Sequence, residues 1–473
     1  MFFSSDLCSV WSKAVPIIRK AILASAVAAL MLAPHAASAE TIFGAMAKAY
    51  ANNPDLNAAR AALRATDENV TIAKAGFRPQ IEATSSLTAI GVRDISTGKD
   101  GYQYNTASVG ISITQRIFDG FQTLNRVRQA ESSVLSSRET VKANEIQTLL
   151  AAAQAYSNVA RDQQIVVIRQ QNLSFLREQV KAANARLEVG EGTSTDVAQA
   201  EAQLAASEAI LAQAISQLKI AEATYVQIVG VMPEGIKQPS PASKAMPGGL
   251  DNAVAIAIRE NPTVLAALHA VDAAGYQVKT AEGVLLPGVV IRGSVQRLTT
   301  SEAPSALNPD YNTGSVTAQI TVPIYQGGAE YGQIRQAKEQ LGQRRILVDS
   351  ARADVQQSVV AAYAQMEAAK AAIAANKKQL AAAQLALNGV IEERNVGTST
   401  TLDVLTSQQN VLNARESLVA SQYNSVVASY SVIAATGRLT IRDQGLQVAE
   451  YRPEEHYEAV KDKWFGLRTV DGR

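Results

Sequence analysis

Cysteine, histidine and net charge are scarce in this sequence, and each shortage argues against a class of protein. Its 473 residues include one cysteine, Cys8, and three histidines, and the formal net charge is +1. No metal-ligand cluster, nucleotide-binding loop or hydrolase motif occurs, so we expect no metal, no cofactor and no enzymatic activity. A near-neutral charge gives no electrostatic case for nucleic acid. An enzyme built on carboxylates is the alternative that motifs alone leave open.

Long apolar runs are also missing. After the first ~40 residues no apolar run reaches 18 residues, so we expect no transmembrane helix, and a closed β-barrel is the remaining way to cross a membrane. Residues 1–39 resemble a secretory signal peptide, with basic residues from Lys13 to Lys20 and small residues at Ala37-Ser38-Ala39. An exported mature chain beginning at Glu40 would then lose Cys8, and with it any thiol, disulfide or cysteine-linked lipid.

Proline and glycine are absent from residues 121–188, a segment rich in good helix formers. Residues 329–394 likewise lack proline, with Gly332, Gly342 and Gly389 as weak points. Each segment predicts a continuous helix of ~65 residues, on the order of 100 Å long. A heptad pattern, which predicts coiled-coil packing, falls at matching places in the two segments: Val127, Val134, Val141 and Thr148, then Ile334, Leu341, Val348 and Val355.

The two segments belong to a tandem duplication. Asn53-Pro54 recurs 208 residues later as Asn261-Pro262, and Val189-Gly190 recurs 207 residues later as Val396-Gly397. Further landmarks keep this order and spacing: Pro79 and Pro287, residues 117–120 and 324–327, and Gln129-Ala130 and Gln336-Ala337. This period far exceeds the roughly 20–50 residues of solenoid repeats. Each copy is therefore predicted to be a set of helices and strands, and the two copies to form one pseudo-symmetric unit.

Each long helix is predicted to turn back on itself. Gly190 and Gly397 follow the helical segments, where glycine is the usual left-handed cap. Thr193-x-x-Asp196 and Thr400-x-x-Asp403 then match capping boxes that begin a new helix. Returning helices are expected at about 194–228 and 401–436. Shorter opening helices are expected at about 41–75 and 250–283, the second with Asn261-Pro262 inside it.

Between the opening and long helices, the apolar period changes from 3.6 to 2. Strand pairs are predicted at about 79–118 and 287–325, joined by polar loops at about 91–103 and 299–312. Aromatic residues lie near the strand ends, at Phe77, Tyr104, Phe118, Tyr311 and Tyr325. This pattern is typical of a membrane barrel, and two water-facing hairpins packed on the helices are the alternative. Because membrane barrels begin at about eight strands, a four-stranded chain that spans a membrane must oligomerise, and three copies would supply twelve strands.

With these features together, the chain resembles the TolC family of outer-membrane efflux and secretion ducts over about residues 40–437. The resemblance is carried by the duplicated order of the Asn-Pro helices, the Pro-led strand pairs ending in Phe118-Asp119-Gly120 and Tyr325-Gln326-Gly327, the long helices and the Val-Gly-x5-Asp-Val turns. It implies a mainly α fold with a small β part, in a homotrimer with a twelve-stranded barrel in the outer membrane and a helical tunnel in the periplasm of a Gram-negative bacterium. It also implies an inner-membrane pump of RND or ABC type and a periplasmic adaptor as partners.

The resemblance assigns roles to the hairpin turns. In the family, aspartates on the second returning helix ring the aperture that closes the tunnel, and Asp403 matches the first of them. The second position is Thr406 here, which leaves one ring and puts cation block in doubt. Arg394 replaces a family tyrosine and is expected to face Asp196, giving an ion pair. Helix capping is the alternative role for Asp196 and Asp403, and a solvated surface charge the alternative for Arg394.

The turn residues match the tips that meet the adaptor in the family, and plain turn residues are the alternative reading. They are Gly190, Thr193, Ser194, Gly397, Thr398 and Ser399. The expected domains are a signal peptide at 1–39, a first repeat at 40–229, an equatorial linker at 230–249, a second repeat at 250–437 and an equatorial segment or tail at 438–473. The expected function is an outer-membrane exit duct that passively conducts drugs or secreted proteins. A structural periplasmic coiled-coil protein without a channel is the alternative.

Overall fold

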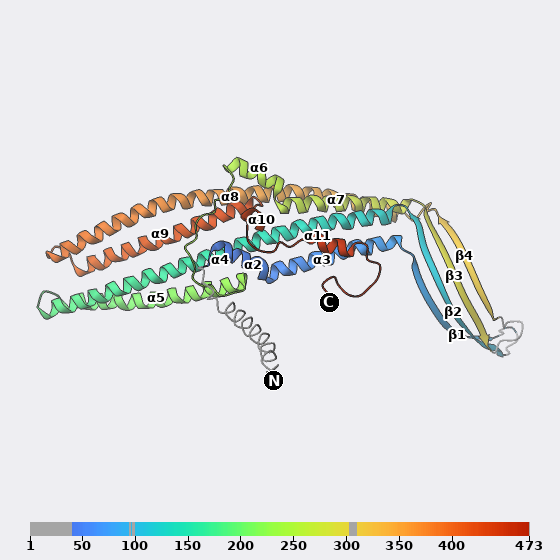
Figure 1. Ribbon diagram of the computed structural model, residues 1–473, viewed down its shortest axis with the longest axis horizontal. Coiled ribbons are helices and arrows are strands. Elements are labelled where there is room, and N and C mark those ends of the chain that lie inside the picture. The colour runs from blue at the N-terminus through green and yellow to red at the C-terminus, as the bar shows by residue number, and fades with distance from the viewer. Residues whose placement is uncertain (1–39, 94–95, 97–99, 302–309, 473) are drawn as a thin grey trace, which may run out of the picture.

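The computed structural model describes residues 40–93, 96, 100–301 and 310–472, so the expected signal peptide and parts of both strand-joining loops lie outside the described residues. The molecule is elongated: the strands lie at one end, the turns of two long helical hairpins lie at the other, and the C-terminal segment lies between them (Figure 1). No helix within the described residues is both long and apolar enough to cross a membrane.

The elements of the two copies follow one order. The first copy comprises α2 (Ile42–Asn52), α3 (Pro54–Lys74), η1 (Ala75–Phe77), β1 (Gln80–Arg93), β2 (Asp100–Asp119), α4 (Gln122–Glu188) and α5 (Ser194–Val229). The second comprises α6 (Leu250–Glu260), α7 (Pro262–Glu282), η2 (Gly283–Leu285), β3 (Gly288–Ser301), β4 (Tyr311–Thr321), α8 (Ala329–Asn395) and α9 (Thr401–Ala435). Two short helices follow, α10 (Ile441–Gln444) and α11 (Pro453–Val460). The predicted duplication, long helices and four strands are confirmed.

The long helices α4 and α8 contain 67 residues each, about 100 Å at 1.5 Å per residue. The predicted heptad positions are the ones that pack: all are buried except Leu341, which is half-buried. On α8 the buried positions form a narrow stripe and most other side chains are exposed within one chain. A single copy therefore leaves a large part of the surface of α8 uncovered.

Each opening helix is split in two at its Asn-Pro pair, so the prediction of one opening helix per copy was wrong. Asn53 and Asn261 adopt extended backbone angles, with ψ of 124° and 126°, because a residue that precedes proline is disfavoured in the α region. The side-chain oxygen of each asparagine then caps the next helix, accepting from Leu56 N and from Thr263 N respectively. The break therefore ends one helix and begins another at a single residue.

The same two asparagines also anchor the returning helices. Asn53 Nδ2 donates to the carbonyl oxygen of Ile228 at 3.1 Å, and Asn261 Nδ2 donates to that of Ala435 at 3.0 Å. These carbonyls belong to the last turns of α5 and α9, where they have no donor inside their own helix. At Gly437, with φ of 81°, a Cβ atom would lie 2.9 Å from Asn261 Cα, so only glycine fits this close approach.

The strands form one antiparallel sheet in the order β1-β2-β3-β4. Its centre joins the two copies, with Ile111 of β2 opposite Val295 of β3. β4 ends at Thr321, earlier than the predicted limit near 325, because Pro323 has no backbone N–H to continue the ladder. β1 and β4 are the edges of the sheet, and neither edge is paired within the chain. This leaves two rows of backbone donors and acceptors without partners in a single copy.

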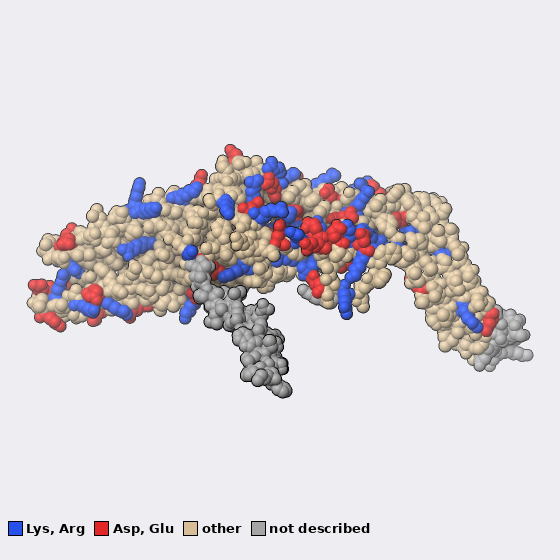
Figure 2. Space-filling view, in the orientation of Figure 1, with Lys and Arg blue, Asp and Glu red and all other residues tan. Residues whose placement is uncertain are grey.

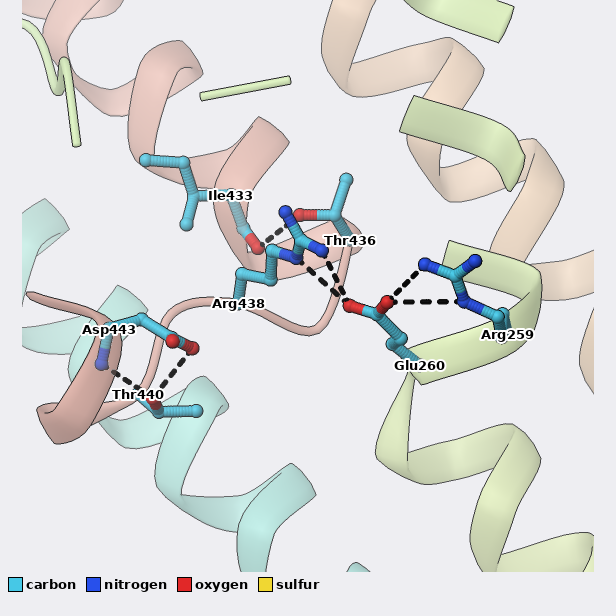
Figure 3. A network of polar contacts seen from close by, with 7 residues as sticks. All are labelled: Arg259, Glu260, Ile433, Thr436, Arg438, Thr440 and Asp443. Carbon is cyan, nitrogen blue, oxygen red and sulfur yellow. Dashed lines mark hydrogen bonds and ion pairs between the residues drawn. The ribbon is translucent and has the colours of Figure 1, made fainter. Parts of the chain in front are cut away.

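The core lies at mid-length, where the ends of the returning helices meet α2, α3 and α4. Residues 230–249 cross this region, and the Tyr156 hydroxyl lies 2.7 Å from the carbonyl oxygens of both Glu40 and Lys237. Beyond α9, Arg438 makes two hydrogen bonds of 3.0 and 2.7 Å with one carboxylate oxygen of Glu260 (Figure 3). Arg259 and Arg438 hold the pKa of Glu260 below its usual range. This pair ties the end of α9 to α6.

We predict that Asn261→Ala destabilises the junction of α7 and α9 by about 1–2 kcal/mol, because a lost cap costs about 1 kcal/mol and the partly buried carbonyl of Ala435 loses its donor. Amide hydrogen exchange in the first turn of α7 and the last turn of α9 should accelerate together. Asn184→Ala is the matched control, since exposed Asn184 bonds only the carbonyl oxygen of Val180 within its own helix. Equal effects of the two substitutions would contradict the double role of Asn261.

Candidate functional site: the hairpin tips

Both hairpins turn with the same backbone geometry. Gly190 and Gly397 take left-handed φ values of 79° and 83°, and a Cβ atom added at either position would have no neighbour within 4 Å. The next amides turn back to the helix, with Glu191 N donating to Arg186 O and Thr398 N donating to Glu393 O, each at 2.9 Å. This six-residue return bond is the Schellman arrangement that ends helices at glycine. The predicted turns are confirmed, and space around both glycines is open.

The returning helices begin with two complete capping boxes. Asp196 N donates to Thr193 Oγ1 at 3.2 Å, and Thr193 N donates back to the Asp196 carboxylate at 3.1 Å. Asp403 and Thr400 repeat this exchange at 3.2 and 2.9 Å. The hydroxyls of Thr193 and Thr400 also donate to these carboxylates, and these bonds hold the pKa of both aspartates below the usual range. Helix capping is therefore one role of each aspartate.

The lowered pKa values fix how the caps respond to pH. A carboxyl group whose pKa falls on folding stabilises the folded state above its unfolded pKa, and this contribution is lost as pH falls through the folded pKa. Asp196 and Asp403 therefore stay ionised and keep their caps at neutral pH. They also stay negatively charged at the end of the molecule where Figure 2 shows acidic and basic side chains gathered on the hairpin turns.

Arg394 contacts a different partner from the one predicted. Its Nη1 donates to Gln179 Oε1 on α4 at 2.7 Å, and its Nε is buried without a partner. Burial, and then the positive charge of Arg186, lower the pKa of Arg394. Among the described residues of one chain, Arg394 and Asp196 form no ion pair, because the guanidinium of Arg394 is directed at α4 and not at the start of α5. Contact between Arg394 and Asp196 of neighbouring chains stays a prediction.

The other predicted tip residues are placed as follows. Thr406 is exposed and donates to the carbonyl oxygen of Leu402 in its own helix at 2.8 Å. Ser399 donates to the Glu393 carboxylate at 2.8 Å and is half-buried, which helps to shape the second turn. Gly190, Thr193, Ser194, Gly397 and Thr398 are exposed.

Two valines at the extreme tips were missed as surface features by sequence reasoning, which used them only as landmarks of the repeat. Val189 and Val396 are 70% and 76% exposed, at equivalent positions just before the turn glycines. Their place in the repeated Val-Gly pair was the available signal. An exposed apolar residue at the end of each hairpin offers a small contact surface for another protein.

Polar contacts join the two hairpins above the tips. Arg169 on α4 forms a charge-assisted pair with Glu416 on α9. Nearby, Gln408 Nε2 donates to Asn172 Oδ1 at 3.0 Å. These pairs, like Gln179 with Arg394, come from sequence positions more than 200 residues apart, so no local pattern revealed them. No group of three side chains among the described residues could hold a metal ion.

Comparisons with known proteins agree with this arrangement. The family model described as outer membrane efflux protein matches residues 45–231 and 253–438, one match for each copy. The outer membrane efflux protein BepC of Brucella suis is 48% identical over 96% of this chain and 98% of its own length. The outer membrane protein TolC of Escherichia coli is 26% identical over 86% of this chain and 84% of its own. The Campylobacter jejuni CmeC outer membrane channel shares the fold, with a TM-score of 0.75, 16% identity and 90% coverage of both chains.

We predict that Thr400→Ala weakens the start of α9 by about 1 kcal/mol, the usual cost of a lost N-cap. Hydrogen exchange of the first-turn amides of α9 should speed up about fivefold, the equivalent of that free energy. Thr406→Ala is the control, because its hydroxyl bonds a carbonyl that is already satisfied within the helix. If exchange at the tip is unchanged in Thr400→Ala, the capping box does not hold this end of the hairpin.

Proposed function

The chain belongs to the outer membrane efflux protein family, and we propose that it forms, as a homotrimer, the outer-membrane exit duct of a tripartite export system. In this role it passively conducts drugs or secreted proteins that an inner-membrane pump of RND or ABC type delivers through a periplasmic adaptor. The observation that carries the proposal is one sheet with two open edges, joined to two helices, α4 and α8, that are each about 100 Å long.

The trimer follows from the number of strands. An open sheet edge in lipid would leave backbone groups unsatisfied, so β1 of one copy needs β4 of another. Exposed apolar side chains on the strands, such as Leu87 at 80% and Val316 at 83%, suit contact with lipid. A membrane barrel needs about eight strands or more. Three copies with four strands each meet this requirement with a closed sheet of twelve strands. Six-chain or two-chain rings would give other masses.

The central experiment is a mass measurement on the full chain extracted in detergent, combined with conductance in a planar bilayer. We expect three chains per particle, resistance of the assembly to unheated gel sample buffer, and ion conductance. A stable monomer in detergent that does not conduct, or a protein that washes off membranes in buffer alone, would instead support the structural coiled-coil alternative.

We further propose that the tips form the closing aperture, with one ring of Asp403. Three ionised carboxylates on a narrow ring raise the negative potential and favour cations over anions. Asp403→Asn separates this role from capping, because asparagine remains a good N-terminal helix residue and accepts hydrogen bonds. Cation selectivity in bilayers should fall in Asp403→Asn while hydrogen exchange at the tip stays near that of the wild type. Unchanged selectivity would leave Asp403 as a cap alone.

Closure is proposed to involve Arg394 and Asp196 of neighbouring chains. Asp196 starts α5, and Arg394 ends α8, so ring closure brings these two tips side by side between copies. A partly exposed ion pair contributes only about 0–1 kcal/mol, so three pairs can bias a balanced equilibrium but cannot lock it.

We therefore predict that Arg394→Ala combined with Asp196→Ala gives a leakier channel with normal trimer yield. Conductance and cell sensitivity to a large antibiotic should both rise. Gln179→Ala is the informative companion, since it removes the partner that Arg394 has within the chain. If only Gln179→Ala opens the channel, the intrachain bond and not the pair with Asp196 holds the tips.

The adaptor is proposed to bind the exposed ends of the turns. Gly190, Thr193 and Ser194 in the first tip, and Gly397, Thr398 and Ser399 in the second, form two similar small surfaces, each beside an exposed valine. Two similar tips per chain give six in a trimer, which suits a partner that repeats around the ring.

A further inference from the structure

The C-terminal segment, residues 453–472, is fixed along α3. Asp67 of α3 is fully buried and lies 2.9 Å from His456 Nδ1 of α11. Thr71 donates to the carbonyl oxygen of Val460 at 2.7 Å, and Arg78 Nη1 donates to that of Lys463 at 2.8 Å. These contacts span the C-terminal part of α3 and reach the start of β1, so the segment is a built part of the fold.

Three large apolar side chains of this fixed segment are nevertheless uncovered. Trp464 is 65% exposed, although the guanidinium of Arg78 lies 4.7 Å from the centre of its ring. Phe465 is 88% exposed and Leu467 fully exposed. An apolar patch on an ordered segment marks a contact surface, because a soluble surface without a partner rarely retains one.

The position of the segment indicates what covers this patch. α3 leads into the edge strand β1, and α8 follows the opposite edge strand β4. In Figure 1 the chain after α11 loops out beside α3, on the side away from α7 and α8. A copy whose β4 pairs with the free edge of β1 brings its own α8 beside this α3 and this segment.

The duplication indicates which stretch of α8 lies at the same distance from the sheet as residues 462–471. Asp462 pairs with Lys74 at 2.7 Å, Lys463 and Trp464 contact Arg78, and Asp471 pairs with Arg64 at 3.6 Å. The segment therefore turns near the sheet and runs back along α3 from the level of Lys74 and Arg78 to that of Arg64. Lys74 is equivalent to Glu282, 208 residues later, and Glu282 pairs with Lys338 of α8 at 3.0 Å. Since α3 runs toward the sheet and α8 away from it, the level of Arg64 matches about residue 348 of α8.

Residues 338–348 of α8 complement the segment in chemistry. Ile346 and Leu347 are 70% and 44% exposed, and apolar. Arg344 and Arg345 are exposed and form no ion pair or hydrogen bond with the described residues. Carboxylates lie near the apolar patch at Glu454, Glu455, Glu458 and Asp462, and each pairs with a basic residue of its own chain while its side chain stays at least 61% exposed. Figure 2 shows acidic side chains gathered around α11.

We propose that residues 453–472 form an intersubunit strap, which packs on residues 338–348 of α8 in a second copy of this chain. The strap rests on the trimer proposed above and adds a contact outside the sheet. Trp464 packs on the end of this stretch nearest the sheet, Phe465 and Leu467 extend the apolar contact toward Ile346 and Leu347, and the strap carboxylates lie near Arg344 and Arg345. The strap thus joins copies at the base of the strands, where the helices meet the sheet.

Trp464 reports directly on this contact, because it is the only tryptophan in residues 40–473. In the assembled protein its fluorescence should be blue-shifted and shielded from acrylamide. Arg344→Glu combined with Arg345→Glu should shift the emission to the red and raise acrylamide quenching severalfold. Lys377→Glu combined with Lys378→Glu is the matched control, since this exposed basic pair lies on the same helix about 50 Å away. The control should keep the wild-type emission.

Cross-linking tests the same contact by proximity. The described residues contain no cysteine, so Leu467→Cys with Ile346→Cys introduces one defined pair. A bis-maleimide should give covalent dimers and trimers from this pair in membranes. Leu467→Cys with Leu385→Cys should give neither, because Leu385 is 74% exposed on α8 but roughly 60 Å from Ile346.

Three results would overturn the strap. A trimeric mass with Trp464 open to acrylamide and no cross-links would remove the strap and leave the proposed duct standing. Quenching of Trp464 by brominated phospholipids in vesicles would show that lipid, not a second copy, covers the patch. A monomeric mass would remove the strap together with the proposed trimer.

Discussion

Each backbone donor and acceptor that is removed from water needs a partner, and the rest of this structure depends on how the chain meets that requirement. At mid-length, one asparagine per copy closes a helix, opens the next and bonds the last turn of a returning helix. At the tips, a threonine and an aspartate exchange hydrogen bonds to start each returning helix. At the sheet, the requirement is not met within one chain, since β1 and β4 remain open. The unmet edges are the physical reason for the proposed assembly.

The two ends of the molecule use different kinds of contact. Apolar positions at heptad spacing, such as Val134 and Val348, pack the long helices toward the sheet. Toward the tips the two hairpins meet through a small apolar cluster of Leu387, Val404 and Val411 together with polar pairs such as Arg169 with Glu416. Packed apolar seams are stable and permit little movement, while partly exposed polar pairs contribute little each. The proposed opening at the tips relies on the polar pairs, which each contribute little.

The middle of the chain couples these ends. The core gathers the ends of α5 and α9, the segment 230–249 and the C-terminal residues around α2, α3 and α4. Arg438 bonds Glu260, and the C-terminal segment follows α3 to the level of Arg78. These contacts hold the ends of the returning helices in place at mid-length. The proposed opening therefore concerns the hairpins beyond this region.

The sequence by itself determined the duplication, the two long helices, the turns and the four strands, because each depends on a local or periodic signal. These signals are the absence of proline, the heptad spacing, the Gly-Thr-Asp turns and the alternation of apolar and polar residues in the strands. Each one can be recognised within a short stretch of sequence. The capping roles of Asp196 and Asp403 were readable for the same reason. Only the tertiary structure decided that Arg394 contacts Gln179, that each Asn side chain also bonds a helix more than 170 residues away, and that the C-terminal segment follows α3. Those contacts join residues far apart in the chain, and which side chains meet there is set by how whole helices pack.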